Sequence, residues 1–186
     1  SVRAVLKART RPFGLEDALE LARQALAGLA YAHGQGFVHR DLKPENLLLG
    51  GNEGQVKIAD FGIASLVGTT TEASGTPPYM APEQLSGSVD RRADIYALGV
   101  VLYEMLTGEL PMGRFPLPSS KVTVDVRLDE VVLKTLEKEP ARRYQQASEI
   151  KKDMDSIAHA PGVPPPPVPP VAAAGPPGRS TRSSGL

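Results

Sequence analysis

The sequence contains 186 residues, and its 21 Lys and Arg balance its 21 Asp and Glu, so the formal net charge is zero. That balance gives no sign of nucleic-acid or membrane-surface binding. Cysteine is absent, which excludes disulfide bonds and thiolate metal sites and fits a reducing compartment. No apolar run approaches the roughly 18 residues of a membrane span, so we expect a soluble, cytoplasmic protein of one domain.

A short amphipathic helix is predicted over residues 1–10, before the Pro-Phe-Gly interruption at 12–14. Its apolar face carries Val2, Val5 and Leu6, and its opposite face carries Arg3 and Lys7.

A long helix is predicted from Leu15 until Gly34, where glycines end it. Apolar residues at 19, 22, 26, 29 and 30 keep helical spacing along this stretch. Two apolar runs follow, Leu47–Leu49 and Val56–Ile58, with glycines between them. This arrangement predicts a β-hairpin.

The second half of the chain alternates loops and helices. Residues 63–80 are polar and rich in Thr, which indicates a loop, and 110–120 form a loop punctuated by prolines. Helices are predicted over 94–107, 127–138 and 147–158. The first of these is apolar nearly all round and is therefore expected to be buried. Residues 161–186 are rich in Pro, Gly, Ala and Ser, a composition that favours an extended or disordered tail.

Residues that can carry chemistry gather on either side of the predicted hairpin. The segment His39-Arg40-Asp41-Leu42-Lys43-Pro44-Glu45-Asn46 precedes it, and Asp60-Phe61-Gly62 follows it. Two carboxylates and an amide suit the binding of divalent metal and polyphosphate beside an acceptor hydroxyl, and oxygen ligands favour Mg²⁺ or Mn²⁺ over zinc. Phosphoryl transfer needs such groups because its transition state spreads negative charge over the transferred oxygens.

The order and spacing of these residues resemble eukaryotic-like serine/threonine protein kinases of the bacterial type. That family carries H-R-D-L-x-x-x-N, then D-F-G, then A-P-E, which is Ala81-Pro82-Glu83 here. Lys43 followed by Pro44-Glu45 is similar to the serine/threonine branch and not to the tyrosine branch. The resemblance implies a mainly α fold over residues 1–160, the helical large lobe of a kinase domain with a short β-hairpin at the active site. A disordered Pro-rich tail over 161–186 would follow.

The resemblance also implies the catalytic roles. Asp41 would be the base, Lys43 would steady the transferred phosphate, and Asn46 and Asp60 would hold the metal. ATP with Mg²⁺ or Mn²⁺ would be bound by Lys43, Glu45, Asn46, Leu48 and Asp60, with Leu48 against the adenine.

Residues 63–80 correspond to the activation segment of the family. Arg40 would pair with phosphate on that segment, although a solvated charge is the alternative. The candidate phosphorylated residues are Thr69, Thr70, Thr71 and Ser74, and Thr76 would help to fix the acceptor and Asp41.

Further residues of the family motifs are expected to be structural. His39 would pack beneath Phe61 instead of acting as a base. Glu83, which is catalytic in appearance, would be a buried partner of Arg143. Asp94 would hold the backbone of the catalytic loop, with a plain helix N-cap as the alternative reading.

The family's small β-rich lobe supplies a glycine-rich loop, a strand lysine and a helical glutamate, and none of these can be placed before His39. We therefore expect the chain alone to be inactive and to require a small lobe or a partner kinase. The alternative is a non-catalytic kinase-like lobe that binds proteins.

Other expected partners are protein substrates and ATP, with no nucleic acid. A start at Ser1 indicates a longer gene product, which could be membrane-anchored beyond the Pro-rich segment. The prolines at 164–167 and 169–170 would be a spacer or, alternatively, a ligand for an aromatic groove.

Overall fold

The computed structural model describes residues 1–9, 11–50, 54–61, 78–87 and 89–158. The predicted tail lies outside these ranges, and so do five residues of the predicted activation segment: Thr69, Thr70, Thr71, Ser74 and Thr76.

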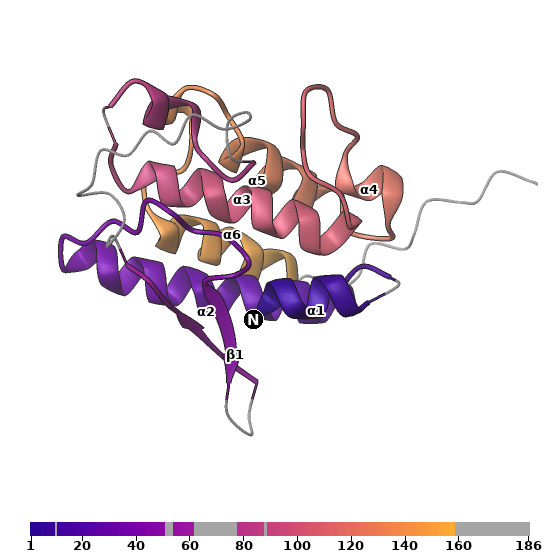
Figure 1. Cartoon of the computed structure of the whole chain (residues 1–186). Coiled ribbons are helices and arrows are strands. Elements are labelled where there is room, and N and C mark those ends of the chain that lie inside the picture. The colour runs from indigo at the N-terminus through magenta and orange to yellow at the C-terminus, as the bar shows by residue number, and fades with distance from the viewer. Residues whose placement is uncertain (10, 51–53, 62–77, 88, 159–186) are drawn as a thin grey trace, which may run out of the picture.

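The first half of the chain forms two helices and a hairpin (Figure 1). Helix α1 spans Val2–Ala8 and α2 spans Leu15–Gly34. Strand β1, Leu47–Gly50, pairs antiparallel with β2, Gln55–Ile58. The register places Leu47 opposite Ile58, so the residues just before β1 and just after β2 meet at one end of the hairpin.

The second half is helical. It comprises the 3₁₀-helices η2 (Pro82–Leu85) and η3 (Pro140–Arg142) and the α-helices α3 (Arg92–Thr107), α4 (Pro118–Lys121), α5 (Arg127–Thr135) and α6 (Ala147–Ala158). The prediction of a mainly helical lobe with one short hairpin is confirmed for the described residues. None of the helices in those ranges has the length and apolarity that a membrane crossing requires.

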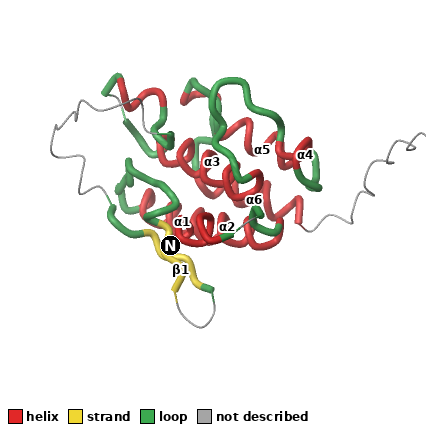
Figure 2. The backbone as a smooth tube through the Cα atoms, turned by 45° about the vertical axis from the view of Figure 1, so that its right-hand side comes forward, coloured by secondary structure: helices red, strands yellow, loops and turns green. Residues whose placement is uncertain are grey.

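Helix α3 lies at the centre of the core. Every residue from Ala97 to Leu106 is buried, as the all-round apolar pattern predicts. Helices α2 and α5 pack on α3, and α6 packs on both α2 and α5. Figure 2 shows strands β1 and β2 standing out from this helical body.

The prediction of a loop over 110–120 is wrong at its end, because α4 begins at Pro118. Proline at the first helical position loses no hydrogen bond. The carboxylate of Asp129, buried on α5, accepts hydrogen bonds from the backbone N–H of Ser119 at 2.9 Å and from its hydroxyl. A cap from a distant element therefore stabilises this turn, and local sequence does not reveal it.

Helix α5 is also shorter than the predicted range of 127–138. It ends at Thr135, and the N–H of Leu136 bonds to the carbonyls of both Val132 and Leu133. Glu139, which precedes Pro140, is extended with φ −81° and ψ 119°. Steric contact with the proline ring disfavours helix at that position, so the chain turns into η3 instead.

Helices α3 and α5 approach closely at Gly99. A methyl group there would lie 2.7 Å from the Cβ of Thr135, well inside van der Waals contact. We expect Gly99→Ala to lower the free energy of unfolding by about 2 kcal/mol through overpacking, against a helix-propensity gain of about 1 kcal/mol. Chemical denaturation measures the free energy of unfolding of the variant against that of the parent chain.

Gly28→Ala is the matched control. Its methyl group would meet the Cδ1 of Ile58 at 3.1 Å, and that atom is the end of a flexible side chain. Equal destabilisation by the two substitutions would show that the α3–α5 contact is not tight at Gly99.

Candidate active site

The loop that leads from α2 to β1 is anchored by Asp94, in the first turn of α3. Its carboxylate, which is buried, accepts hydrogen bonds from the backbone N–H groups of His39 at 2.8 Å and Arg40 at 2.7 Å. The Nε2 of His33 on α2 lies 2.8 Å from the same carboxylate. These contacts hold Arg40 at φ 69°, a left-handed conformation that costs a non-glycine residue free energy.

His39 joins this loop to the segment after β2. Its buried ring donates from Nε2 to the carbonyl of Ala59 at 2.8 Å, and its Nδ1 accepts from the N–H of Asp41 at 3.3 Å. The ring also packs against Phe61, with centroids 4.8 Å apart. Both nitrogens are occupied in the neutral tautomer, so the geometry suits a structural link and not a proton acceptor.

Asp41 projects its carboxylate outward from this fixed backbone. Its side chain is 52% exposed and accepts from the Nζ of Lys43 at 2.6 Å. Its own carbonyl accepts from the Nδ2 of Asn46 at 2.9 Å. An exposed carboxylate on a rigid loop can meet the hydroxyl of an incoming molecule.

Asn46 and Asp60 lie at the open end of the hairpin, just before β1 and just after β2. Asn46 is buried, and its carbonyl accepts from the N–H of Ala59 at 2.9 Å, which sets Asp60 next to this pair. Since the amide nitrogen of Asn46 is bound to Asp41, its amide oxygen is the atom left for a cation. Asp60 is exposed and has φ 59°, a conformation that aspartate tolerates better than most residues.

An amide oxygen and a carboxylate fit a hard cation such as Mg²⁺. Within the described ranges there is no cluster of three or more His, Cys, Asp or Glu residues that could hold a metal. Magnesium commonly takes only one or two protein ligands and completes its shell with phosphate and water, so the pair suits a metal that arrives with a polyphosphate.

Leu48 lies on β1 beside this end of the hairpin. Alternation along the strand buries Leu47 and leaves Leu48 42% exposed. An exposed leucine at this place can contact a flat apolar group such as a base.

Arg3 was expected on the polar face of its helix but turns inward, and this part of the prediction is wrong. Its side chain is only 18% exposed, and the guanidinium binds Glu45 at 2.7 Å and Glu104 at 2.6 Å. It also bonds to the hydroxyl of Tyr79, which donates to Glu104. The partners come from segments far along the chain, so helical periodicity could not reveal them.

The electrostatics of this cluster are strongly coupled. Burial disfavours the charged form of Arg3, but its hydrogen bonds to Glu104 and Glu45 hold its pKa above the ordinary value. Burial acts against ionisation of Glu45 too, yet Arg3 lowers the pKa of that carboxyl. Burial and the neighbouring Glu104 raise the pKa of Tyr79. All three groups therefore keep their ordinary charge states near neutral pH.

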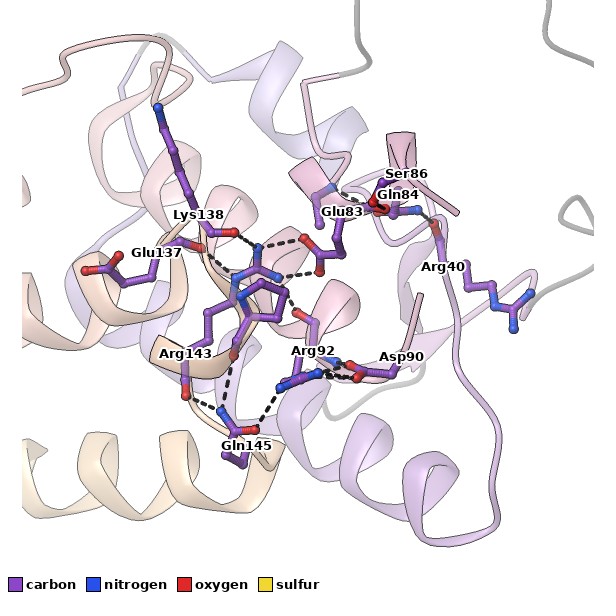
Figure 3. A network of polar contacts seen from close by, with 12 residues as sticks. Arg40, Glu83, Gln84, Ser86, Asp90, Arg92, Glu137, Lys138, Arg143 and Gln145 are labelled. Carbon is purple, nitrogen blue, oxygen red and sulfur yellow. Dashed lines mark hydrogen bonds and ion pairs between the residues drawn. The ribbon is translucent and has the colours of Figure 1, made fainter. Parts of the chain in front are cut away.

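Glu83 and Arg143 form a buried ion pair behind the site (Figure 3). Arg143 has a fully buried side chain and donates to Glu83 at 2.6 and 2.8 Å. Its remaining N–H groups bind the carbonyls of Glu137, Lys138 and Arg92. Glu83 is thus saturated by one cation and lies away from the exposed Asp41.

Arg40 leaves its side chain exposed, while its carbonyl is bound by the Nε2 of Gln84 at 2.8 Å (Figure 3). Its predicted phosphate partners fall outside the described residues. Asp41, Lys43 and Arg40 line a cavity of about 460 Å³, which Glu45 and Tyr79 border from other segments.

Comparison with known proteins agrees with this geometry. Residues 1–160 match the protein kinase domain family. The chain belongs to the protein kinase family. It is 39% identical over 176 residues to the serine/threonine-protein kinase PknB of Mycobacterium leprae, a match that covers 83% of this chain and 28% of that protein. A probable serine/threonine-protein kinase of Clostridium perfringens is 37% identical over 80% of this chain and 24% of its own length.

The fold agrees with solved kinase structures. The crystal structure of the Mycobacterium tuberculosis PknI kinase domain matches with a TM-score of 0.67 and 28% identity, over 84% of this chain and 61% of that one. The resemblance to bacterial serine/threonine kinases is therefore confirmed. The chain spans about 28% of the length of the PknB relative.

Three site residues escaped the sequence reasoning: His33, Tyr79 and Glu104. His33 is separated from Asp94 by 61 positions, and Arg3 is separated from Glu104 by 101. The kinase-like spacing of the motifs predicts the loop from His39 to Asn46. It gives no information about side chains outside the motifs that hold this loop in place.

Proposed function

We propose that this chain is the catalytic large lobe of a kinase that transfers the γ-phosphate of ATP to serine and threonine hydroxyls of proteins. The observation that carries the proposal is the placement of Asp41. Its carboxylate is exposed beside a cavity, while the neighbouring His39 and Glu83 are fully engaged in structural contacts.

In the proposed reaction the acceptor hydroxyl approaches Asp41. Its oxygen forms a bond to the γ-phosphorus of ATP, the bond from that phosphorus to the β–γ bridging oxygen breaks, and the hydroxyl proton passes to the Asp41 carboxylate. Lys43, 2.6 Å from that carboxylate, offers a positive charge to the transferred phosphate.

Magnesium, when bound, would neutralise negative charge on the phosphates. Asn46 would hold it through the amide oxygen that its bond to Asp41 leaves available. Asp60 would hold it through a carboxylate presented at the same end of the hairpin. Leu48 would contact the adenine.

The test is phosphate transfer from radiolabelled ATP to a general protein substrate. The 186-residue chain is compared with the same chain joined behind the small lobe of a similar bacterial kinase. We expect the chain alone to stay near background, since loss of even one preorganised donor costs about 10²- to 10³-fold in rate. The joined protein should transfer phosphate to Ser or Thr. A joined protein that folds and binds ATP without transfer would contradict the proposal.

A protein-binding module is the second candidate. Tyr31 and Phe37 are 74% and 63% exposed, and with Phe61 they line a cavity of about 490 Å³ at the end of α2. Large exposed aromatic side chains of this kind favour contact with another protein. The failed-transfer outcome above would leave this candidate in place.

A further inference from the structure

A groove runs from Asp41 along α1. It consists of the cavity of about 460 Å³ beside Asp41 and a second cavity of about 350 Å³, which share Arg3, Lys7 and Glu104. We call the two together the Asp41 groove. In Figure 1 helix α1 lies beside the start of β1, and the N–H of Arg3 bonds to the carbonyl of Pro44 at 3.1 Å. The groove thus borders the catalytic loop directly.

The carboxylates of the Asp41 groove are all bound by cations of the chain. Arg3 binds both Glu45 and Glu104. Lys43 binds Asp41, and Lys121 binds Glu109. The negative charge of these carboxylates is therefore largely neutralised before a ligand binds.

Several cationic side chains of the groove, in contrast, have no carboxylate partner among the described residues. Lys7, Arg11 and Arg40 are exposed and line the two cavities, and no ion pair engages them within the described part of the chain. Arg9 lies over the ring of Phe13, 4.4 Å from its centroid, and its ion pair with the exposed Asp17 is loose, at 3.7 Å. The groove consequently presents positive charge to its contents.

Arg3 determines this balance. Among the described residues, Arg3 is the cation that pairs with both Glu45 and Glu104, and the hydroxyl of Tyr79 also binds Glu104. Glu104 is nearly buried, with a side chain 11% exposed. Without Arg3 the groove would present two carboxylates next to Asp41, and their charge would attract cationic side chains. A single residue of α1 therefore separates a cationic groove from an anionic one.

We propose that Arg3 is a specificity-determining residue that makes the Asp41 groove select acceptor serines and threonines within acidic peptide segments and reject those within basic segments. The inference rests on the proposed function only in calling the bound serine or threonine a phosphate acceptor. Selection between acidic and basic peptides is measurable without phosphate transfer.

The experiment measures binding by fluorescence anisotropy at low salt, where charge contacts are least screened. The probes are a labelled peptide with a central serine flanked by glutamates and the same peptide with lysines in their place. The 186-residue chain should bind the acidic peptide at least about 10-fold more tightly. Arg3→Met should lower the affinity for the acidic peptide about 10-fold and raise the affinity for the basic peptide by a similar factor.

Two further variants keep the test independent of the folding of Arg3→Met. Glu45→Gln, at a side chain 45% exposed, removes one of the two carboxylates that neutralise Arg3 and should raise the affinity for the acidic peptide about threefold. Lys7→Met should lower that affinity about threefold. The matched control is Arg142→Met, an exposed arginine outside both cavities, which should change neither affinity.

Equal affinity of the unmodified chain for both peptides would overturn the inference, as would an unchanged preference in a folded Arg3→Met protein. Equally tight binding of an oligothymidylate of the same charge would also overturn it, since it would reveal a general polyanion surface. Acidic-peptide selection without phosphate transfer by the joined protein would refute the proposed function and leave this inference standing.

Discussion

Asp41→Asn is expected to lower the rate of phosphate transfer by about 10²- to 10⁴-fold, the usual contribution of a general base. The protein is the chain joined to a small lobe, assayed with radiolabelled ATP and a protein substrate. Asparagine keeps the size of the side chain and can still accept a hydrogen bond from Lys43, which lies 2.6 Å from Asp41. The backbone contacts of residue 41 with His39 and Asn46 do not involve the carboxylate. The loss should therefore be chemical and not structural.

The matched control for this prediction is Asp17→Asn on α2. That side chain is 63% exposed and meets only Arg9 at 3.7 Å, so the same chemical change should leave the rate nearly constant. Melting temperatures of both variants should stay close to the parent value. An Asp41→Asn enzyme that is fully active would remove Asp41 from the role of base.

Arg143→Met is expected to destabilise the fold by about 3–5 kcal/mol, the typical result of breaking a buried ion pair. The guanidinium is fully buried, and its removal leaves the carboxylate of Glu83 without its cation. The carbonyls of Glu137, Lys138 and Arg92 lose a donor at the same time. In a domain of this size the change corresponds to a drop of roughly 10 °C in melting temperature.

The neighbouring residue supplies the control for this ion pair. Arg142 is exposed, so Arg142→Met removes the same charge one position away and should alter the free energy of unfolding by about 0.5 kcal/mol or less. Thermal denaturation followed by circular dichroism compares the two. A stable Arg143→Met protein would mean that Glu83 finds another partner and that the pair does not hold η2 against α3.

Local patterns were sufficient for α2, whose apolar residues keep helical spacing, and for α3, which is apolar on nearly all sides up to Gly108. They were also sufficient for the hairpin, whose two apolar runs have glycines between them. They were insufficient wherever a distant residue decides the structure. The turn of α4 depends on Asp129 of another helix. Arg3 turns inward because Glu104, 101 positions later, lies on that side.

The candidate site shows the same division. Motif spacing predicts that Asp41, Asn46 and Asp60 gather, since a hairpin returns the chain to its starting point. The left-handed backbone of Arg40 could not be predicted from its residue type, because arginine seldom adopts that conformation. The conformation of Arg40 accompanies its hydrogen bond to Asp94, which forms only once α3 and the loop are packed together.

Asp94 carries one more consequence. A carboxylate in the first turn of α3 binds two successive amides of the catalytic loop, and α3 is buried along most of its length. Loop and helix are thereby a single cooperative unit: the loop cannot loosen alone, and it cannot stay ordered if α2 and α3 separate. The position of Asp41 thus depends on global folding and not on a local equilibrium of the loop, so a substitution far inside the helical core should also disturb Asp41.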